Sequence, residues 1–303
     1  MGATTQSNIV GYLTDYARGI GLGAIDPAAN ILAPVTRVAS PVGKYKRFDD
    51  KNAFQVPNTA RAIGGPRRRI EFNADDADYN CKPQALEIGI DDQETAGGDP
   101  IAIQQLKART LVTAAARAHA VIVFETAAAG LAAAATPAWS TPSSGNPIAD
   151  LNAQIEAIVT ATGEFPTHAL FGVTAWRHFV SHDKVAEKFK SGVVNPATVQ
   201  AAQLLMAPNL QFVVSPLCRD TAKPGAARSM ASVYGANVFL LISPPGPTLY
   251  DPSFMKTFRT SESGVEAVKL YRDESRASDI LAVDWSQDIQ IVSTASARRL
   301  TVT

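Results

Sequence analysis

The stretch from Lys44 to Glu94 limits the possible folds more than any other part of the chain, because it is highly charged and holds few large apolar residues. Its basic residues come first, at Lys44, Lys46, Arg47, Lys51, Arg61, Arg67, Arg68 and Arg69. Its acidic residues follow, at Glu71, Asp75, Asp76, Asp78, Glu87, Asp91, Asp92 and Glu94; the exceptions are Asp49, Asp50 and Lys82. Residues 62–66 give a turn signal, and residues 69–72 alternate as a half-exposed strand does. We expect a long hairpin-like excursion that is ordered only against another surface.

Residues 1–43 have the composition of an extended arm. Glycines and prolines are scattered along them, at Gly19, Gly21, Gly23, Pro27, Pro34 and Pro41. No sustained helical stripe is visible. The apolar run at 31–38 suits docking on a partner subunit, and Pro34 excludes that run from a central strand position. If a lone molecule folded both this arm and the excursion onto its own surface, the case for partner subunits would fail.

A strong helix start lies at Asp99 and Pro100, where Asp99 can cap free amides and Pro100 fits the first helical position. The pattern predicts a helix from there to about Ala128. Apolar residues cover one broad side, and Lys107, Arg109 and Arg117 are interspersed with them. We interpret the helix as a buried spine with a solvent edge.

The second half of the chain predicts a compact mixed α/β body. A helix starts at Asn146 and Pro147 and stops at Gly163, and a strand covers 167–172. Further helices are expected at 174–190 and, capped by Asn195, at 196–206. Strands are expected at 210–215 and 231–243. Near the end, odd positions 281–291 are mostly apolar and alternate with polar ones, so one strand face should be buried and the other wet.

Composition indicates a globular protein and excludes several classes. Of 303 residues, 46% are hydrophobic and 18% charged, which is enough to bury a core. Lys plus Arg and Asp plus Glu both number 28, so no overall field favours nucleic acid or an anionic membrane. No secretory signal begins the chain, and we expect it to be cytosolic when synthesised. Cys81 and Cys218 form no C-x-x-C pair, so we read both as reduced thiols.

Catalytic and ligand-binding patterns are weak. His178 and His182 have a metal-ligand spacing, but no third ligand is in view, and we expect two exposed histidines. Asp76, Asp78, Asn80 and Glu87 fit part of a calcium-loop template, yet Cys81 replaces its glycine. The glycines at 19, 21 and 23 lack the lysine of a phosphate-binding loop. The sequence contains no G-x-S-x-G motif, which would mark a catalytic serine nucleophile.

Several segments, taken in order, resemble the major capsid protein of tailed bacteriophages. They are Pro34–Val38 through Gly43–Phe48, then Ile88–Glu94 leading into the capped helix, then Thr162–Phe171 after the helix that begins at Asn146. The match covers almost the whole chain, and its specificity lies in the order and spacing of the parts. Two departures are the lack of a long scaffolding segment before the arm and of an identifiable pair for covalent cross-linking.

The resemblance implies an α+β fold with an N-terminal arm, an extended loop, a long spine helix, a peripheral domain and an axial domain. The corresponding ranges are 1–43 for the arm, 44–94 for the extended loop and flanking strands, 95–140 for the spine helix and peripheral domain, 141–265 for the axial domain, and 266–303 for strands that return to both domains.

The resemblance also implies a non-enzymatic coat protein that forms the pentamers and hexamers of an icosahedral head around double-stranded DNA. Its partners would be itself, portal, scaffolding and decoration proteins, and DNA bound without sequence specificity; no cofactor and no membrane is implied. It would be assembled in the host cytoplasm and reside in the virion. We hypothesise contacts between subunits at Lys44, Lys46, Arg47, Arg61, Arg67, Arg68, Arg69, Glu71, Asp75, Asp76 and Asp78. An encapsulin-like compartment shell and a soluble α/β enzyme remain as alternatives.

Overall fold

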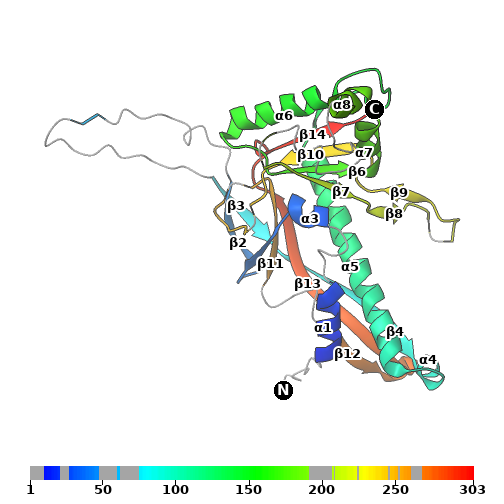
Figure 1. Cartoon of the computed structure of the whole chain (residues 1–303). Coiled ribbons are helices and arrows are strands. Elements are labelled where there is room, and N and C mark those ends of the chain that lie inside the picture. Colours follow the sequence, from blue (N-terminus) through cyan, green and yellow to red (C-terminus); the bar gives the residue numbers. More distant parts are fainter. Residues whose placement is uncertain are drawn as a thin grey trace.

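Two sheets are joined by one long helix that runs along most of the molecule (Figure 1). The computed structural model describes residues 10–20, 27–47, 60–61, 75–190, 207, 209–223, 225–244, 246–251, 253–260 and 268–303. The helix, α5, spans Pro100–Gly130, with Asp99 accepting a hydrogen bond from the Ile101 amide at 3.0 Å. The predicted helix start is therefore confirmed.

The β10 sheet has the strand order β5-β14-β10-β6-β7. Its strands are β5 (Ala133–Ala135), β14 (Ala297–Thr301), β10 (Asn237–Leu241), β6 (His168–Gly172) and β7 (Gln211–Ser215). Helices α6 (Pro147–Thr162), α7 (Val173–Val180) and α8 (Asp183–Lys190) belong to the same body. β6 is buried along nearly its whole length because Ala169 and Phe171 enter one core and Leu170 enters another.

The start and the end of α6 were predicted correctly from capping residues in the sequence. Asn146 Oδ1 accepts from the Ala149 amide at 3.3 Å, and Pro147 is the first helical residue. The helix ends at Gly163, whose φ of 72° is the left-handed conformation that glycine adopts without strain. The strands predicted at 167–172 and 210–215 are confirmed as β6 and β7.

Two predictions for this body are wrong in part. The helix predicted over 174–190 is two helices, α7 and α8, because His182 ends one and starts the other. Its Nδ1 accepts from the Lys184 amide at 3.2 Å, and its Nε2 lies 2.8 Å from the Ser144 carbonyl oxygen. The strand predicted over 231–243 is divided into β9 (Met230–Ser232) and β10 by a turn in which Gly235 has a φ of 51°. The helix predicted over 196–206 lies outside the described residues.

The β13 sheet has the strand order β1-β11-β13-β12, with β4 on the other side of β13. Its strands are β1 (Val35–Val38), β11 (Met255–Thr260), β13 (Ser278–Ile291), β12 (Val268–Asp273) and β4 (Lys82–Asp91). α4 (Asp92–Ala96) follows β4, and a 3-10 turn, η2 (Glu274–Arg276), joins β12 to β13. Two small ribbons, β2 (Val42–Arg47) with β3 (Asp75–Asn80), and β8 (Cys218–Asp220) with β9, complete the strands of the described chain.

β13 alternates as predicted on the face that meets α5. Leu281, Val283 and Trp285 are buried there with Leu111 and Val112 of α5. The opposite face is less exposed to solvent than expected, because Ala282 is only 8% exposed. Ala282 is small and lies between Lys269 of β12 and Glu87 of β4 in the register, so these long side chains flank it on that face.

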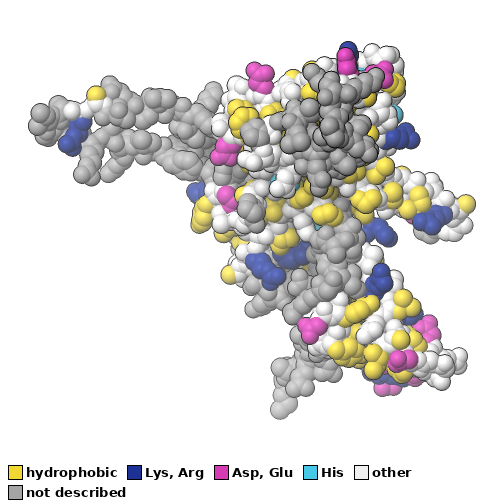
Figure 2. Space-filling view, viewed as in Figure 1, with side chains coloured by type: hydrophobic (Ala, Val, Ile, Leu, Met, Phe, Trp, Pro, Cys, Tyr) yellow, Lys and Arg dark blue, Asp and Glu magenta, His cyan; other side chains and the backbone are white. Residues whose placement is uncertain are grey.

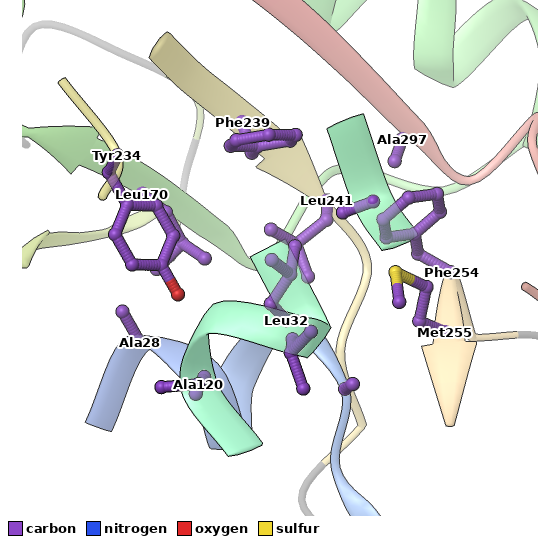
Figure 3. Close-up of a cluster of buried hydrophobic side chains, with 14 of the residues drawn as sticks. Ala28, Leu32, Ala120, Leu170, Tyr234, Phe239, Leu241, Phe254, Met255 and Ala297 are labelled. Atoms are coloured by element: carbon purple, nitrogen blue, oxygen red, sulfur yellow. The ribbon is translucent and has the colours of Figure 1, made fainter. Parts of the chain in front are cut away.

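The prediction of an extended arm is wrong for most of its described residues. α1 (Gly11–Ile20) packs on α5 and β12 through Leu13 and Ala17. α3 (Pro27–Leu32) inserts Ala28 and Leu32 into the core beside Leu170 and Phe254, as Figure 3 shows. β1 then pairs in parallel with β11 at the edge of the β13 sheet. α1, α3 and β1 are therefore packed against other parts of their own chain. The argument that these elements need a partner subunit in order to be ordered fails.

Candidate subunit-contact surfaces

The β2–β3 ribbon carries most of the described residues that we hypothesised to contact other subunits. The antiparallel register sets Lys44 opposite Asp78, Lys46 opposite Asp76 and Arg47 opposite Asp75. Lys46 Nζ lies 2.5 Å from Asp76 Oδ1. This hydrogen bond lowers the pKa of Asp76 below its usual value. The expected hairpin is therefore confirmed at its base, where the basic and acidic arms pair within one chain; the ion pair between Lys46 and Asp76 was not predicted.

The structure gives less information on the remaining residues that we hypothesised to contact other subunits. Arg61 is exposed. Arg67, Arg68, Arg69 and Glu71 lie outside the described residues. Contact between any of these charges and a second subunit stays a prediction.

The base of the ribbon is fixed to the body by aromatic packing. Tyr45 of β2 and Tyr79 of β3 both lie against Phe258 of β11, with ring centroids 5.0 and 4.8 Å away. The Asn80 amide donates to Asp288 of β13 at 2.8 Å. Burial raises the pKa of both tyrosine hydroxyls, so they remain protonated well above neutral pH. This packing therefore holds the β2–β3 ribbon against the β13 sheet.

A second charged surface lies at the far end of α5, and we call it the acidic tip: residues 91–107 and 272–279. It holds seven acidic and three basic side chains. Arg272 organises it by donating to both carboxylate oxygens of Asp92 at 2.5 and 2.6 Å and to Asp279 at 3.3 Å. The hydrogen bond from Arg272 lowers the pKa of Asp92. Sequence reasoning missed this cluster because its two segments are far apart in the chain.

The described residues offer little for metal or phosphate chemistry. No group of three His, Cys, Asp or Glu side chains within them is placed to hold a metal ion. The expectation of two exposed histidines is wrong, because His182 is fully buried and bonded to backbone and His178 is partly buried. The residues of the calcium template lie on β3 and β4 rather than in a loop between helices. Of the three glycines near the start, Gly21 and Gly23 lie outside the described part.

By length and composition alone, α5 is able to cross a membrane, which is weak evidence because core helices of soluble proteins share these properties. In this structure nine of its residues are buried, among them Ala108, Val112 and Val123, while Arg109 and Arg117 are exposed. The prediction of a buried spine with a solvent edge is confirmed.

This arrangement of two sheets and a long helix is similar to that of known proteins. Residues 102–229 match the family model of phage major capsid protein E. The fold is similar to that of a phage-related protein from Bordetella bronchiseptica, with a TM-score of 0.76, 23% identity and 98% of each chain covered. This chain has the tailed-phage capsid fold. A sequence comparison with curated proteins found no match.

Two further structures with the tailed-phage capsid fold show its range. The mature capsid of bacteriophage PhiM1 is similar at a TM-score of 0.55 and 14% identity, with 91% of this chain and 86% of that chain covered. An encapsulin from Synechococcus elongatus is similar at a TM-score of 0.53 and 9% identity, with 99% and 92% covered. The α+β fold that the resemblance implied is thus confirmed.

The division of the chain at 43, 94, 140 and 265 stays a prediction. β11 belongs to the β13 sheet although it falls within the range expected for the axial domain. β13 and β14, which follow one another, belong to different sheets.

Proposed function

We propose that the protein is the major capsid protein of a phage head and assembles into the pentamers and hexamers of an icosahedral shell around double-stranded DNA. One observation carries the proposal: a phage capsid family model matches residues 102–229, which include most of α5 and much of the β10 body. The shared fold agrees with it across nearly the whole chain.

The shape of the molecule supports assembly. The β8–β9 ribbon projects from the body beside α5 (Figure 1). Contacts made through such projections are individually modest, but closure into a symmetric shell makes every copy depend on its neighbours. In this proposal the chain acts by geometry and performs no catalysis.

The proposed partners follow from the same role. Copies of the chain contact each other, and portal, scaffolding and decoration proteins join them. The inner face meets packaged DNA weakly and without sequence specificity, because the chain carries no net charge. Assembly takes place in the bacterial cytoplasm, and the product is the virion shell.

An encapsulin-like compartment is the second candidate, since an encapsulin shares the fold. The experiment that separates the two is purification of particles from cells that carry the complete phage or host gene cluster, followed by nuclease treatment. A phage head protects double-stranded DNA, whereas a compartment holds a protein cargo and no protected genome. A monodisperse small species stabilised by a small ligand would instead favour the soluble enzyme.

The charged excursion gives a second test of assembly. We expect reversal of Arg67, Arg68 and Arg69 to glutamate to block or misdirect assembly while the subunit stays folded, because like charges would then face each other between copies. The matched control reverses Arg177 and Lys184 on α7 and α8, an exposed basic pair elsewhere. Normal particles from the triple variant would refute the hypothesis that these three arginines contact carboxylates of an adjacent subunit.

A further inference from the structure

The β8–β9 hairpin, described at residues 218–223 and 225–232, is a basic projection that the proposed shell does not yet explain. Asp220 Oδ1 accepts from the amides of Ala222 and Ser229, both at 2.9 Å, which holds the turn in one conformation. Arg219 Nη1 lies 2.6 Å from Glu125 Oε1 of α5, which fixes the direction of the hairpin. These contacts tie the described hairpin residues to one another and to α5, while the residues near the turn are exposed.

The exposed side chains of the hairpin have the composition of a protein contact. The segment carries three basic residues and one acidic residue. Lys223 and Arg228 are exposed, and Met230 is 49% exposed. Figure 2 shows basic and apolar side chains together on this projection. A duplex-binding surface neutralises many phosphates, and the hairpin has only three basic side chains, of which Arg219 is paired with Glu125.

The acidic tip has the complementary composition. Its net charge is negative, and Glu274 is 87% exposed at its side chain. Two large apolar side chains at the start of α5 are also exposed, Ile101 by 55% and Leu106 by 63%. Acidic and apolar side chains lie together there in Figure 2. Interfaces combine an apolar centre with charged surroundings in this way.

The two surfaces are too far apart to meet within one molecule. The hairpin is tied to α5 at Glu125, and the tip is tied to it at Lys107, whose Nζ lies 2.9 Å from Glu94. Eighteen helical residues separate these points, or about 27 Å at 1.5 Å per residue. A contact between unlike surfaces on two copies is heterologous when it repeats head to tail, and it generates a ring where the rotation closes.

We propose that the β8–β9 hairpin of one copy binds the acidic tip of a second copy. Lys223 and Arg228 then face Glu94 and Glu274, and Met230 packs near Ile101 and Leu106. This inference rests on the proposed function, because it names one of the contacts by which the shell holds together.

The test is charge exchange in the full-length chain. The hairpin variant combines Lys223→Glu and Arg228→Glu, the tip variant combines Glu94→Lys and Glu274→Lys, and a third chain carries all four substitutions. We expect the yield of particles, measured by sedimentation and electron microscopy, to fall at least about tenfold in each two-site variant, because like charges oppose each other there. The four-site chain should recover most of the yield. The control reverses Arg177 and Lys184 and should assemble as the wild type does.

Each other outcome overturns the inference. Normal yield from the hairpin variant shows that the hairpin contacts nothing needed for assembly. Loss of particles without recovery in the four-site chain, with circular dichroism showing folded subunits, shows that its partner is another surface. Normal shells that retain less nucleic acid show that it contacts the packaged genome. If the wild type and the control form no particles, the proposed function itself fails, and the inference fails with it.

Discussion

Acidification should weaken the fold through His119, which lies on α5 above the β13 sheet and is 2% exposed. Burial, and then the positive charge of Arg259 on β11, lower the pKa of His119 from 6.5 to about 3; Gln287 on β13 acts in the opposite direction. Arg259 Nη2 donates to Gln287 Oε1 at 2.8 Å, so the cation is held close to the imidazole.

The sign and size of the effect follow from linkage. Between pH 6.5 and about 3 the unfolded chain binds a proton at this residue and the folded chain does not. Stability that is fully present above pH 6.5 is therefore lost as the pH falls through this window. Relative to pH 8, the free energy of unfolding should drop by about 2 kcal/mol at pH 5 and about 3 kcal/mol at pH 4 through His119 alone.

Urea unfolding of the unassembled subunit at several pH values is the assay, with His119→Gln as the comparison. Carboxylates contribute equally to both proteins, so only the difference between the two curves reports on the imidazole. We expect the wild type to lose about 2 kcal/mol more than the variant between pH 8 and pH 5. Parallel curves would refute the argument that the folded subunit keeps the buried His119 imidazole neutral beside Arg259.

Two further substitutions test the packing of the β10 body. Gly172→Ala should destabilise the subunit by about 3 kcal/mol or more, because its new methyl carbon would lie 2.1 Å from the backbone oxygen of Gly235; Gly89→Ala on β4, where space is open, should change stability by less than about 1 kcal/mol. Equal melting temperatures for these two variants would contradict the close approach. Asn146→Ala should cost about 1 kcal/mol in denaturant unfolding by removing the cap of α6, whereas Asn152→Ala on the exposed face of that helix should be neutral or slightly stabilising. A destabilisation of similar size in both would assign the effect to something other than the cap.

Signals confined to a few residues were enough to predict several elements. The starts of α5 and α6 follow from Asp99–Pro100 and Asn146–Pro147, because the capping side chain and the proline act on neighbouring amides. The break at His182 was missed since its ring also bonds to Ser144, a contact that no local pattern contains.

Features that depend on distant partners were not predictable in this way. α1 and α3 are stabilised by burial of Leu13 and Leu32 against α5 and the cores, and their own short sequences carry no sustained helical stripe that would have revealed them. Pro34 did not prevent the following strand, because β1 begins after it and pairs at a sheet edge. Among the hypothesised contacts, Lys46 was recognised as part of a charged arm, but its bond to Asp76 required the register of the ribbon.

The central claim is that copies of this chain build a closed shell, and electron microscopy of the expressed full-length protein tests it most directly. We predict closed particles or capsomer rings, with or without a co-expressed scaffolding protein. A folded monomer that persists at high concentration, even when scaffold is supplied, would contradict the account.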